Sequence, residues 1–157
     1  MVNDTKQQGR SRGLIDAFLD VEQFHQAGDV PVLMSPAFPS NERIVLRQDL
    51  IIEEYTELLN AIDERDMTAV ADGITDLIYV LIGAALEFGI PLPDVWFAIH
   101  ASNMAKIDPK TGKVRKRDDG KILKPEGWTP PDIAAVLDAA RKRYEERIAA
   151  VEKAANG

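Results

Sequence analysis

Two stretches decide the fold of this chain, because both have the apolar spacing of helices and both carry carboxylates. They are Leu50-Ile51-Ile52-Glu53-Glu54-Tyr55-Thr56-Glu57-Leu58-Leu59 and Ala71-Asp72-Gly73-Ile74-Thr75-Asp76-Leu77-Ile78-Tyr79-Val80-Leu81. A buried carboxylate is costly unless it is paired or holds a metal. The function of these acids therefore depends on which groups surround them in the fold.

Each stretch lies in a longer predicted helix. The first helix is expected from Asn41 to about Glu64, and the second follows a turn at residues 65–68 and runs to Phe88. Helices joined by such a short turn are antiparallel neighbours. The second is apolar on most faces, so we expect it at the centre of the domain. Further helices are predicted over 14–27, from Pro93 to about Lys106, and over 131–154, with an extended, proline-bearing connection at 29–40.

The character of the sequence changes between residues 108 and 127, which are rich in Lys, Arg, Asp and Gly. Two short runs flank Asp118-Asp119-Gly120, which predicts a β-hairpin over about 114–124. The expected architecture is thus all-α: a bundle of four to five helices with one small hairpin. We expect a single domain over 1–157, with its core at about 14–107, the hairpin at 113–124 and the C-terminal helix at 131–154.

Composition narrows the class of protein. The 157 residues carry a net charge of -7 and a sequence pI of about 4.9, which argues against the basic footprint of a nucleic-acid binder. There is no cysteine, so thiolate metal sites are excluded. Residues 1–12 lack the apolar core of a signal peptide, and the longest apolar run, 77–86, is shorter than the ~20 residues of a membrane span. We therefore expect a cytoplasmic protein with no nucleic-acid or membrane partner.

The acids break the helical pattern in a consistent way. On a helical wheel of residues 41–64, Glu54 and Glu57 fall within the apolar arc and Glu53 lies at its edge. Asp72 and Asp76, four residues apart, repeat the arrangement on the next helix. Carboxylates converging at this density repel one another, and a divalent cation relieves the repulsion. All-oxygen ligands suit Mg²⁺, with Mn²⁺ as an alternative.

Two other interpretations of these acids are open. The acids could be solvated, or could pair with Arg43, Arg47 and Lys106. A carboxylate-bound iron pair would need Glu-x-x-His on two helices. Glu22 and His25 supply one such motif, but His100 has Phe97 three residues before it, so the second motif is missing.

The motif Glu53-Glu54-x-x-Glu57, followed by Asp76-Leu77-Ile78-Tyr79, resembles the all-α nucleoside triphosphate pyrophosphohydrolases. These include the MazG-like proteins, the dimeric dUTPases and phosphoribosyl-ATP pyrophosphohydrolase. Ser102-Asn103-Met104-Ala105-Lys106 is also similar to the MazG-like and phage-type branch. There is one departure from the family's Glu-x-x-Asp: the Glu position holds Gly73 if Asp76 is the aspartate, or Ala69 if Asp72 is.

The resemblance implies a Mg²⁺-dependent enzyme that cleaves a (d)NTP to the (d)NMP and pyrophosphate, either of dUTP/dCTP type or as a broad clean-up activity. The metal ligands would be Glu53, Glu54, Glu57, Asp72 and Asp76, and either Glu53 or Glu54 would be the catalytic base. We expect a homodimer or homotetramer, because so short an acidic helix pair is expected to complete its site against a second subunit. The alternative is a weakened or inactive helical interaction module of the same fold.

Substrate contacts need hydrogen-bond donors and cations. The candidates are Asn103, Lys106, Arg47, Tyr79, Lys121 and Lys124. Asn103 could bind a base or sugar, and Lys106 a phosphate; Tyr79 could stack on a base or pack in the core. The hairpin's cations could form a flap over the triphosphate, or could simply be solvated.

Overall fold

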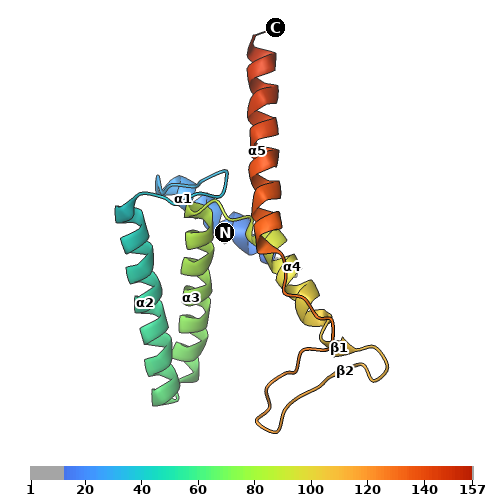
Figure 1. The fold of residues 1–157 in the computed structure, drawn as a ribbon. Helices are drawn as coiled ribbons and strands as arrows, with labels where there is room; N and C mark the ends of the chain where they lie inside the picture. Colours follow the sequence, from blue (N-terminus) through green and yellow to red (C-terminus); the bar gives the residue numbers. More distant parts are fainter. Residues whose placement is uncertain (1–12, 157) are drawn as a thin grey trace, which may run out of the picture.

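The structure is a computed structural model that describes residues 13–156; the expectations about residues 1–12 lie outside this range. The described residues form five helices and two short strands, shown in Figure 1: α1 (Leu14–Ala27), α2 (Asn41–Glu64), α3 (Met67–Glu87), α4 (Leu92–Met104), β1 (Ile107–Asp108), β2 (Lys113–Val114) and α5 (Ile133–Ala155). The predicted all-α class is confirmed.

The helices form a central hairpin with two extensions. Helices α2 and α3 lie antiparallel along their whole length, and α1 crosses the end of α3 that lies away from their turn (Figure 1). Helix α4 leads away from this junction to the two strands, and α5 returns along α4 before projecting beyond it. The predicted central place of α3 is thus confirmed, since it packs against both α1 and α2.

The turn between α2 and α3 follows from local sequence. Arg65 ends α2 in the left-handed conformation, with φ 57°. The carboxylate of Asp66 then caps α3 by accepting hydrogen bonds from the backbone N–H groups of Thr68 (2.9 Å) and Ala69 (3.2 Å). A capping aspartate satisfies donors that the first helical turn leaves free. This two-residue connection brings the acid-bearing turns of both helices to the same end of the hairpin.

The buried core is small and lies where α1 crosses α3. Val21, Ile82 and Leu86 form it, and Ala17, Phe18, Val32 and Leu92 pack around them. The connection at 29–40 closes this junction through hydrogen bonds such as Leu33 N–H to the Leu86 carbonyl (3.0 Å). The core therefore holds one end of the hairpin and leaves the rest of α2 and α3 to pack on each other alone.

The structure has antiparallel pairing at the predicted β-hairpin and a further pair of short strands just before it. Strands β1 and β2 pair Ile107 with Val114 and Asp108 with Lys113, around a turn that includes Gly112 with φ 66°. At the predicted site an antiparallel bridge joins Lys116 to Ile122, the Arg117 N–H donates to the Lys121 carbonyl (2.9 Å) and the Leu123 N–H donates to the Arg115 carbonyl (2.8 Å). The runs on either side of Asp118-Asp119-Gly120 are mostly charged and face solvent, so they have no apolar face to hold longer strands.

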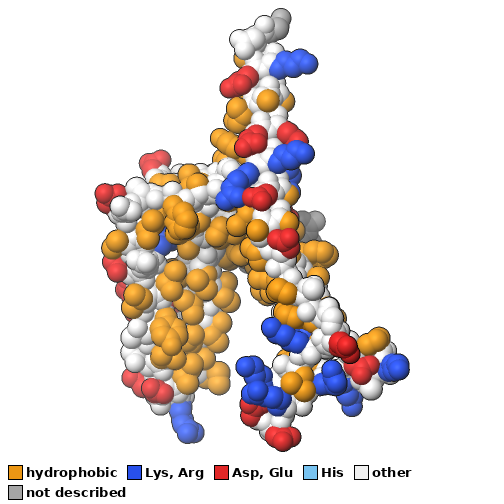
Figure 2. Space-filling model, viewed as in Figure 1, with side chains coloured by type: hydrophobic (Ala, Val, Ile, Leu, Met, Phe, Trp, Pro, Cys, Tyr) orange, Lys and Arg blue, Asp and Glu red, His pale blue; other side chains and the backbone are white. Residues whose placement is uncertain are grey.

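Much apolar surface remains uncovered in the single chain. Ile52, Tyr55 and Leu59 on α2 are exposed, as are Ile74 and Ile78 on α3. Their spacing puts them on one side of the hairpin, and Figure 2 shows hydrophobic side chains gathered over a face of α2 and α3. We define these five residues as the apolar face. Leu46 and Ile62, also on α2, are 40% and 49% exposed.

By length and composition, α3 would also be able to cross a membrane, with a mean hydropathy of 1.7 over its most apolar window. Core helices of soluble proteins pass the same test. Asp72 and Asp76 lie within α3, and α1 and α2 pack on it. Charged side chains are costly inside a bilayer, so these contacts favour a central helix of a folded domain.

Gly73 marks the closest approach of α2 and α3. A Cβ added there would lie 3.1 Å from the Cα and 3.2 Å from the Cβ of Leu58. Alanine normally favours a helix by about 1 kcal/mol over glycine, but here it would force the two helices apart. We expect Gly73→Ala to destabilise the protein by about 1–3 kcal/mol, and Gly73→Glu by more, as measured by denaturant unfolding. A higher midpoint for Gly73→Ala would show that this contact is not tight.

Candidate active site

The five acids of the sequence motif lie on the two helices of the hairpin. Glu53, Glu54 and Glu57 occupy adjacent turns of α2, and Asp72 and Asp76 occupy adjacent turns of α3. Glu54 is half-buried, as the helical wheel predicted. Glu57 is exposed in the single chain, so its predicted inward position is not seen here. The antiparallel packing brings these two acidic segments to the same part of the hairpin.

Glu54 is the point on which the charges converge. Desolvation by its surroundings raises the pKa of the Glu54 carboxyl, and the negative charges of Asp76, Glu57, Glu53 and Asp72 raise it further, in that order. A carboxylate feels a neighbour's charge only when the two are close. The acids of both helices therefore act together on the Glu54 carboxyl.

The donor chemistry of this acidic cluster suits a hard divalent cation. Carboxylate oxygens are the ligands that Mg²⁺ and Mn²⁺ prefer. No ion pair within residues 13–156 neutralises any of the five acids. In the same residues, no three Asp, Glu or His side chains are gathered closely enough to hold a metal as they stand. The four exposed carboxylates are free to rotate, so a bound cation could draw them together.

A shallow hollow lies beside the acids, at the end of the hairpin near its turn. It is lined from α2 by Glu57, Asn60, Ala61 and Glu64, and from α3 by Ala69, Asp72 and Gly73. Two of the five acids thus border an open depression. Gly73, the glutamate position of the family pattern if Asp76 is its aspartate, forms part of the floor of this hollow against Leu58. A larger side chain at that position would occupy the seam between the helices.

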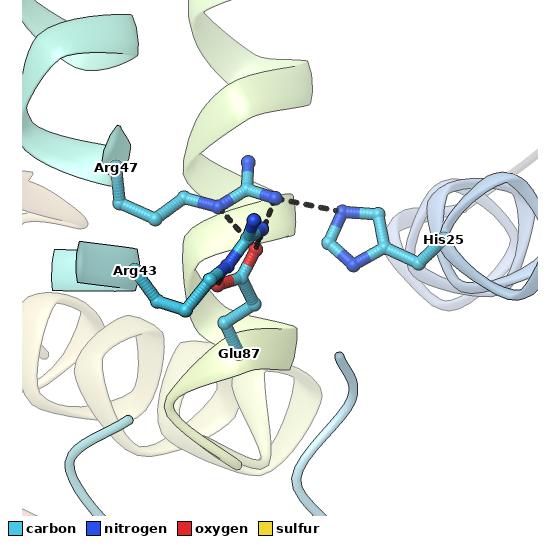
Figure 3. A network of polar contacts seen from close by, with 4 residues as sticks. All are labelled: His25, Arg43, Arg47 and Glu87. Carbon is cyan, nitrogen blue, oxygen red and sulfur yellow. Dashed lines mark hydrogen bonds and ion pairs between the residues drawn. The ribbon is translucent and has the colours of Figure 1, made fainter. Parts of the chain in front are cut away.

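A second acid, Glu87 at the end of α3, is the most deeply buried charged group of the described chain (Figure 3). Arg43 donates through Nε to Glu87 Oε2 at 2.8 Å, and Arg47 donates through Nε to Oε1 at 2.6 Å. Burial alone would raise the pKa of Glu87, but the hydrogen bonds and charges of the two arginines outweigh it and lower that pKa below its usual value. Glu87 is therefore ionised and fully paired.

His25 completes this network from α1. Its Nε2 lies 3.2 Å from a terminal guanidinium nitrogen of Arg47. Burial, and then the charge of Arg47, lower the pKa of His25, although the Pro31 carbonyl and Glu87 act in the opposite direction. The imidazole is thus neutral and accepts from Arg47. Its Nδ1 makes no hydrogen bond of good geometry within the described residues.

From the sequence, Arg47 was a candidate to pair with a carboxylate or to bind a substrate phosphate. The structure places it against Glu87, 7% exposed and several turns of α2 before Glu54. Glu87 was not predicted from the sequence as a functional or buried residue, although the sequence around it indicates one. It is an acid within Leu86-Glu87-Phe88, at the end of an apolar helix, and Arg47 falls in the buried arc of the preceding helix.

The remaining candidate substrate residues lie apart from the acids. Asn103 accepts a hydrogen bond from Lys106 Nζ at 2.8 Å, at the end of α4. Lys124 lies over the Trp128 ring at 4.3 Å from its centroid, and Lys106 lies near the same ring at 5.2 Å. Lys121 follows in the same loop region. The structure thus brings Asn103, Lys106 and Lys124 together, but beside the strands and not beside α2 and α3 (Figure 1).

Tyr79 lies on α3 three residues after Asp76. Its ring packs edge-to-face against Phe24 of α1, with 5.9 Å between the ring centroids. The side chain remains 38% exposed. Of the two roles expected for Tyr79, the structure shows the packing contact, which joins α1 to α3.

Comparison with known proteins assigns the family. The sequence profile of the phosphoribosyl-ATP pyrophosphohydrolases matches residues 21–103, which span the second half of α1, all of α2 and α3, and nearly all of α4. Because this match covers more than half of the chain, the protein belongs to the phosphoribosyl-ATP pyrophosphohydrolase family. Its members share the nucleotide pyrophosphohydrolase type of domain, as the resemblance of the acidic motif predicted.

Two individual relatives give weaker support for the family than the sequence profile does. The uncharacterized protein L479 of Acanthamoeba polyphaga mimivirus is 39% identical over 62 residues, which are 39% of this chain and a quarter of that protein. A crystal structure of a provisionally assigned NTP pyrophosphohydrolase from Exiguobacterium sp. 255-15 is 23% identical and superposes with a TM-score of 0.42. The match covers 84% of this chain and 97% of that one. A TM-score at this level carries no argument about function.

The buried Glu87 network makes stability depend on pH. The lowered pKa of His25 means that the unfolded chain takes up a proton before the folded one, so stability falls as pH drops through about 6.5. The lowered pKa of Glu87 has the same effect as pH drops through about 4.5. We expect two successive losses of stability on acidification, measurable as urea midpoints between pH 8 and pH 4.

Single substitutions distinguish the two losses of stability on acidification. His25→Gln should remove the loss near pH 6.5 and leave the one at lower pH. Glu87→Gln should lower stability at pH 7.5 by about 3–5 kcal/mol, because the buried Arg47 and the half-buried Arg43 lose their counter-charge. An unchanged pH profile in both variants would contradict this assignment of the titrating groups.

Proposed function

We propose that this protein is a Mg²⁺-dependent nucleoside triphosphate pyrophosphohydrolase that releases pyrophosphate from a (d)NTP and leaves the (d)NMP. The observation that carries the proposal is the placement of five carboxylates on the packed helices α2 and α3, four of which raise the pKa of the fifth, Glu54. Within a family of pyrophosphohydrolases, such a cluster suits cation-assisted cleavage of a phosphoanhydride. Mn²⁺ could replace Mg²⁺ at an all-oxygen site.

The roles of the residues follow from the chemistry of hydrolysis. Glu53, Glu54, Glu57, Asp72 and Asp76 would hold the cation. When bound, Mg²⁺ neutralises phosphate charge and lowers the pKa of water. Water attacks phosphorus, the bridging P–O bond breaks towards pyrophosphate, and a carboxylate takes the proton of the attacking water. Glu53 and Glu54 are the candidates for that base. The charges of the other four acids raise the pKa of Glu54.

Recognition of the nucleotide would fall to the residues at the end of α4 and in the following loop. The Asn103 side chain has amide groups that could bind a base or sugar. Lys106, Lys121 and Lys124 carry the positive charge that a triphosphate needs. Because these residues lie apart from the acids in the single chain, a complete site requires the two groups to be brought together in an assembly, such as a homodimer or homotetramer.

A second candidate function is a helical interaction module that keeps the fold and has lost most of its catalysis. The observation in its favour is Gly73. Tight packing against Leu58 leaves no room for the glutamate of the family pattern at this position. Asp72, on the preceding position of α3, is the nearest replacement for that carboxylate. A measurement of pyrophosphate release distinguishes the enzyme from the interaction module.

The test is pyrophosphate release from a panel of NTPs, dNTPs and phosphoribosyl-ATP, with Mg²⁺ present. We expect release from at least one nucleotide, its loss on treatment with a chelator, and its recovery with added Mg²⁺ or Mn²⁺. Glu54→Gln should reduce kcat/KM by about 10²-fold or more, because it removes both a ligand charge and a candidate base.

Asp63→Asn provides the matched control, since Asp63 is an exposed acid on the same helix and outside the cluster. It should retain wild-type release. The enzymatic assignment fails if no nucleotide on the panel is cleaved, and the site assignment fails if Glu54→Gln and Asp63→Asn behave alike.

A further inference from the structure

A pocket of about 290 Å³ lies where α1, the connection at 29–40, the end of α3 and α5 meet. Its floor is apolar and includes Phe18 of α1, Val32 and Leu33 of the connection, Leu86 of α3 and Ile90 just after α3. Covering such groups with an apolar ligand removes them from water, which favours binding. We call this space the junction pocket.

The junction pocket is separate from the candidate active site. None of the five acids of α2 and α3 lines it. Leu86 follows Asp76 by ten residues of α3, which is about 15 Å along a helix. A ligand in the junction pocket would therefore lie at the other end of the helical hairpin from the acids.

The backbone around the floor is fixed, so the pocket is formed before any ligand binds. The Leu33 N–H donates to the Leu86 carbonyl at 3.0 Å, which holds the connection against α3. Gly89 has φ 62°, and a Cβ added there would lie only 2.2 Å from the Ser35 carbonyl oxygen. A pocket with a preformed floor requires little ordering when a ligand enters.

Helix α5 forms the opposite wall and is held at two points. Arg143 donates to the Asp94 carboxylate of α4 at 2.7 Å, and Arg141 donates through Nε to the Pro36 carbonyl at 3.4 Å. The side of α5 that lines the pocket carries four residues at helical spacing. They are Ala140, Arg143, Tyr144 and Arg147.

Two charges of opposite sign face the pocket without a partner. Glu22 is half-buried on α1, and Arg147 is exposed on α5. Within residues 13–156, neither forms an ion pair with the other or with any third residue. Arg143, in contrast, is already paired with Asp94. The pocket thus presents one free carboxylate and one free guanidinium on different walls above an apolar floor.

This distribution of charge selects the chemistry of a ligand. A ligand ammonium would pair with Glu22, and a ligand carboxylate would pair with the guanidinium of Arg147, each through charge-assisted hydrogen bonds. A ligand that is only anionic would face the Glu22 carboxylate, and one that is only cationic would face Arg147. The two free charges together therefore favour a zwitterion.

The size and floor of the pocket limit the rest of the ligand. Pockets for organic ligands range upward from about 300 Å³, so a space of about 290 Å³ suits a small molecule and not a peptide. The apolar floor, with the ring of Phe18, favours an apolar or aromatic side chain. The Tyr144 hydroxyl offers one further polar group on the α5 wall.

We propose that the junction pocket binds an apolar α-amino acid, whose ammonium contacts Glu22, whose carboxylate contacts Arg147 and whose side chain covers the apolar floor. The occupant is a free small molecule, bound at a site that the candidate active site does not include. The proposal does not rest on the proposed function, because binding is measured without any nucleotide.

The first test uses the wild-type chain and L-phenylalanine as the probe. Titration into ¹⁵N-labelled protein at pH 7.5 should shift backbone amide signals at 18–22, 32–34 and 140–147, with a Kd of the order of 1 mM. Two matched compounds each lack one charge: 3-phenylpropanoate has no ammonium, and 2-phenylethylamine has no carboxylate. We expect both to bind at least about fivefold more weakly, because each leaves one charge of the pocket unpaired.

Substitutions then assign each charge to its partner. Glu22→Gln should weaken L-phenylalanine about fivefold and leave 3-phenylpropanoate no weaker, since that compound has no ammonium to lose a partner. Arg147→Gln should weaken L-phenylalanine similarly and leave 2-phenylethylamine no weaker. Lys142→Gln is the matched control, because Lys142 is an exposed cation of α5 outside the pocket; it should bind L-phenylalanine like the wild type.

The pattern across compounds distinguishes recognition from damage to the fold, because a distorted pocket would weaken all three compounds together. Equal binding of the three compounds to the wild type would overturn the proposal, since it would show apolar contact alone. So would shifts confined to the apolar face of α2 and α3. A pocket covered by a second copy of the chain would give no shifts at 18–22 or 140–147 with any compound, and that result would overturn the proposal as well.

Discussion

The ion pair between Glu87 and two arginines of α2 is the interaction on which the hairpin depends. Glu87 has no exposed surface, and an unpaired carboxylate in that position would be strongly unfavourable. Because Arg43 and Arg47 lie one turn apart, their shared contact with Glu87 sets how far α2 is shifted along α3. His25 then ties α1 to the same point. The register fixed at this end determines which turns of α2 and α3 meet further along.

That register explains why the acids converge. Gly73 faces Leu58 at the closest contact of the two helices, and Asp72 and Asp76 lie on the turns around it. Glu54 consequently feels the charges of both aspartates as well as those of its own helix. The pattern of the family, in which a glutamate precedes the aspartate by three residues, is incompatible with so close an approach at Gly73. Close helix packing and a further carboxylate at position 73 exclude each other.

The single chain is an incomplete structure in physical terms. Its core is confined to the crossing of α1 and α3, and the apolar face of the hairpin remains exposed. Helix α3 is apolar on most sides because it is suited to neighbours on most sides, and one chain supplies only two of them. The five acids of α2 and α3 and the cations of residues 105–128 also lie on separate parts of the molecule (Figure 1).

The sequence by itself determined the helices, the all-α class and the placement of Glu53, Glu54, Glu57, Asp72 and Asp76 on two helices joined by one short turn, because these depend on short-range spacing. It predicted the turn around Asp118-Asp119-Gly120, where Lys116 and Ile122 pair, but not the strands at Ile107–Asp108 and Lys113–Val114. Only the tertiary structure decided that Arg47 pairs with Glu87, that Glu57 is exposed and that Asn103, Lys106 and Lys124 lie away from the acids. The reason is that burial and pairing depend on which segments meet across the fold, and no periodicity within one segment records that.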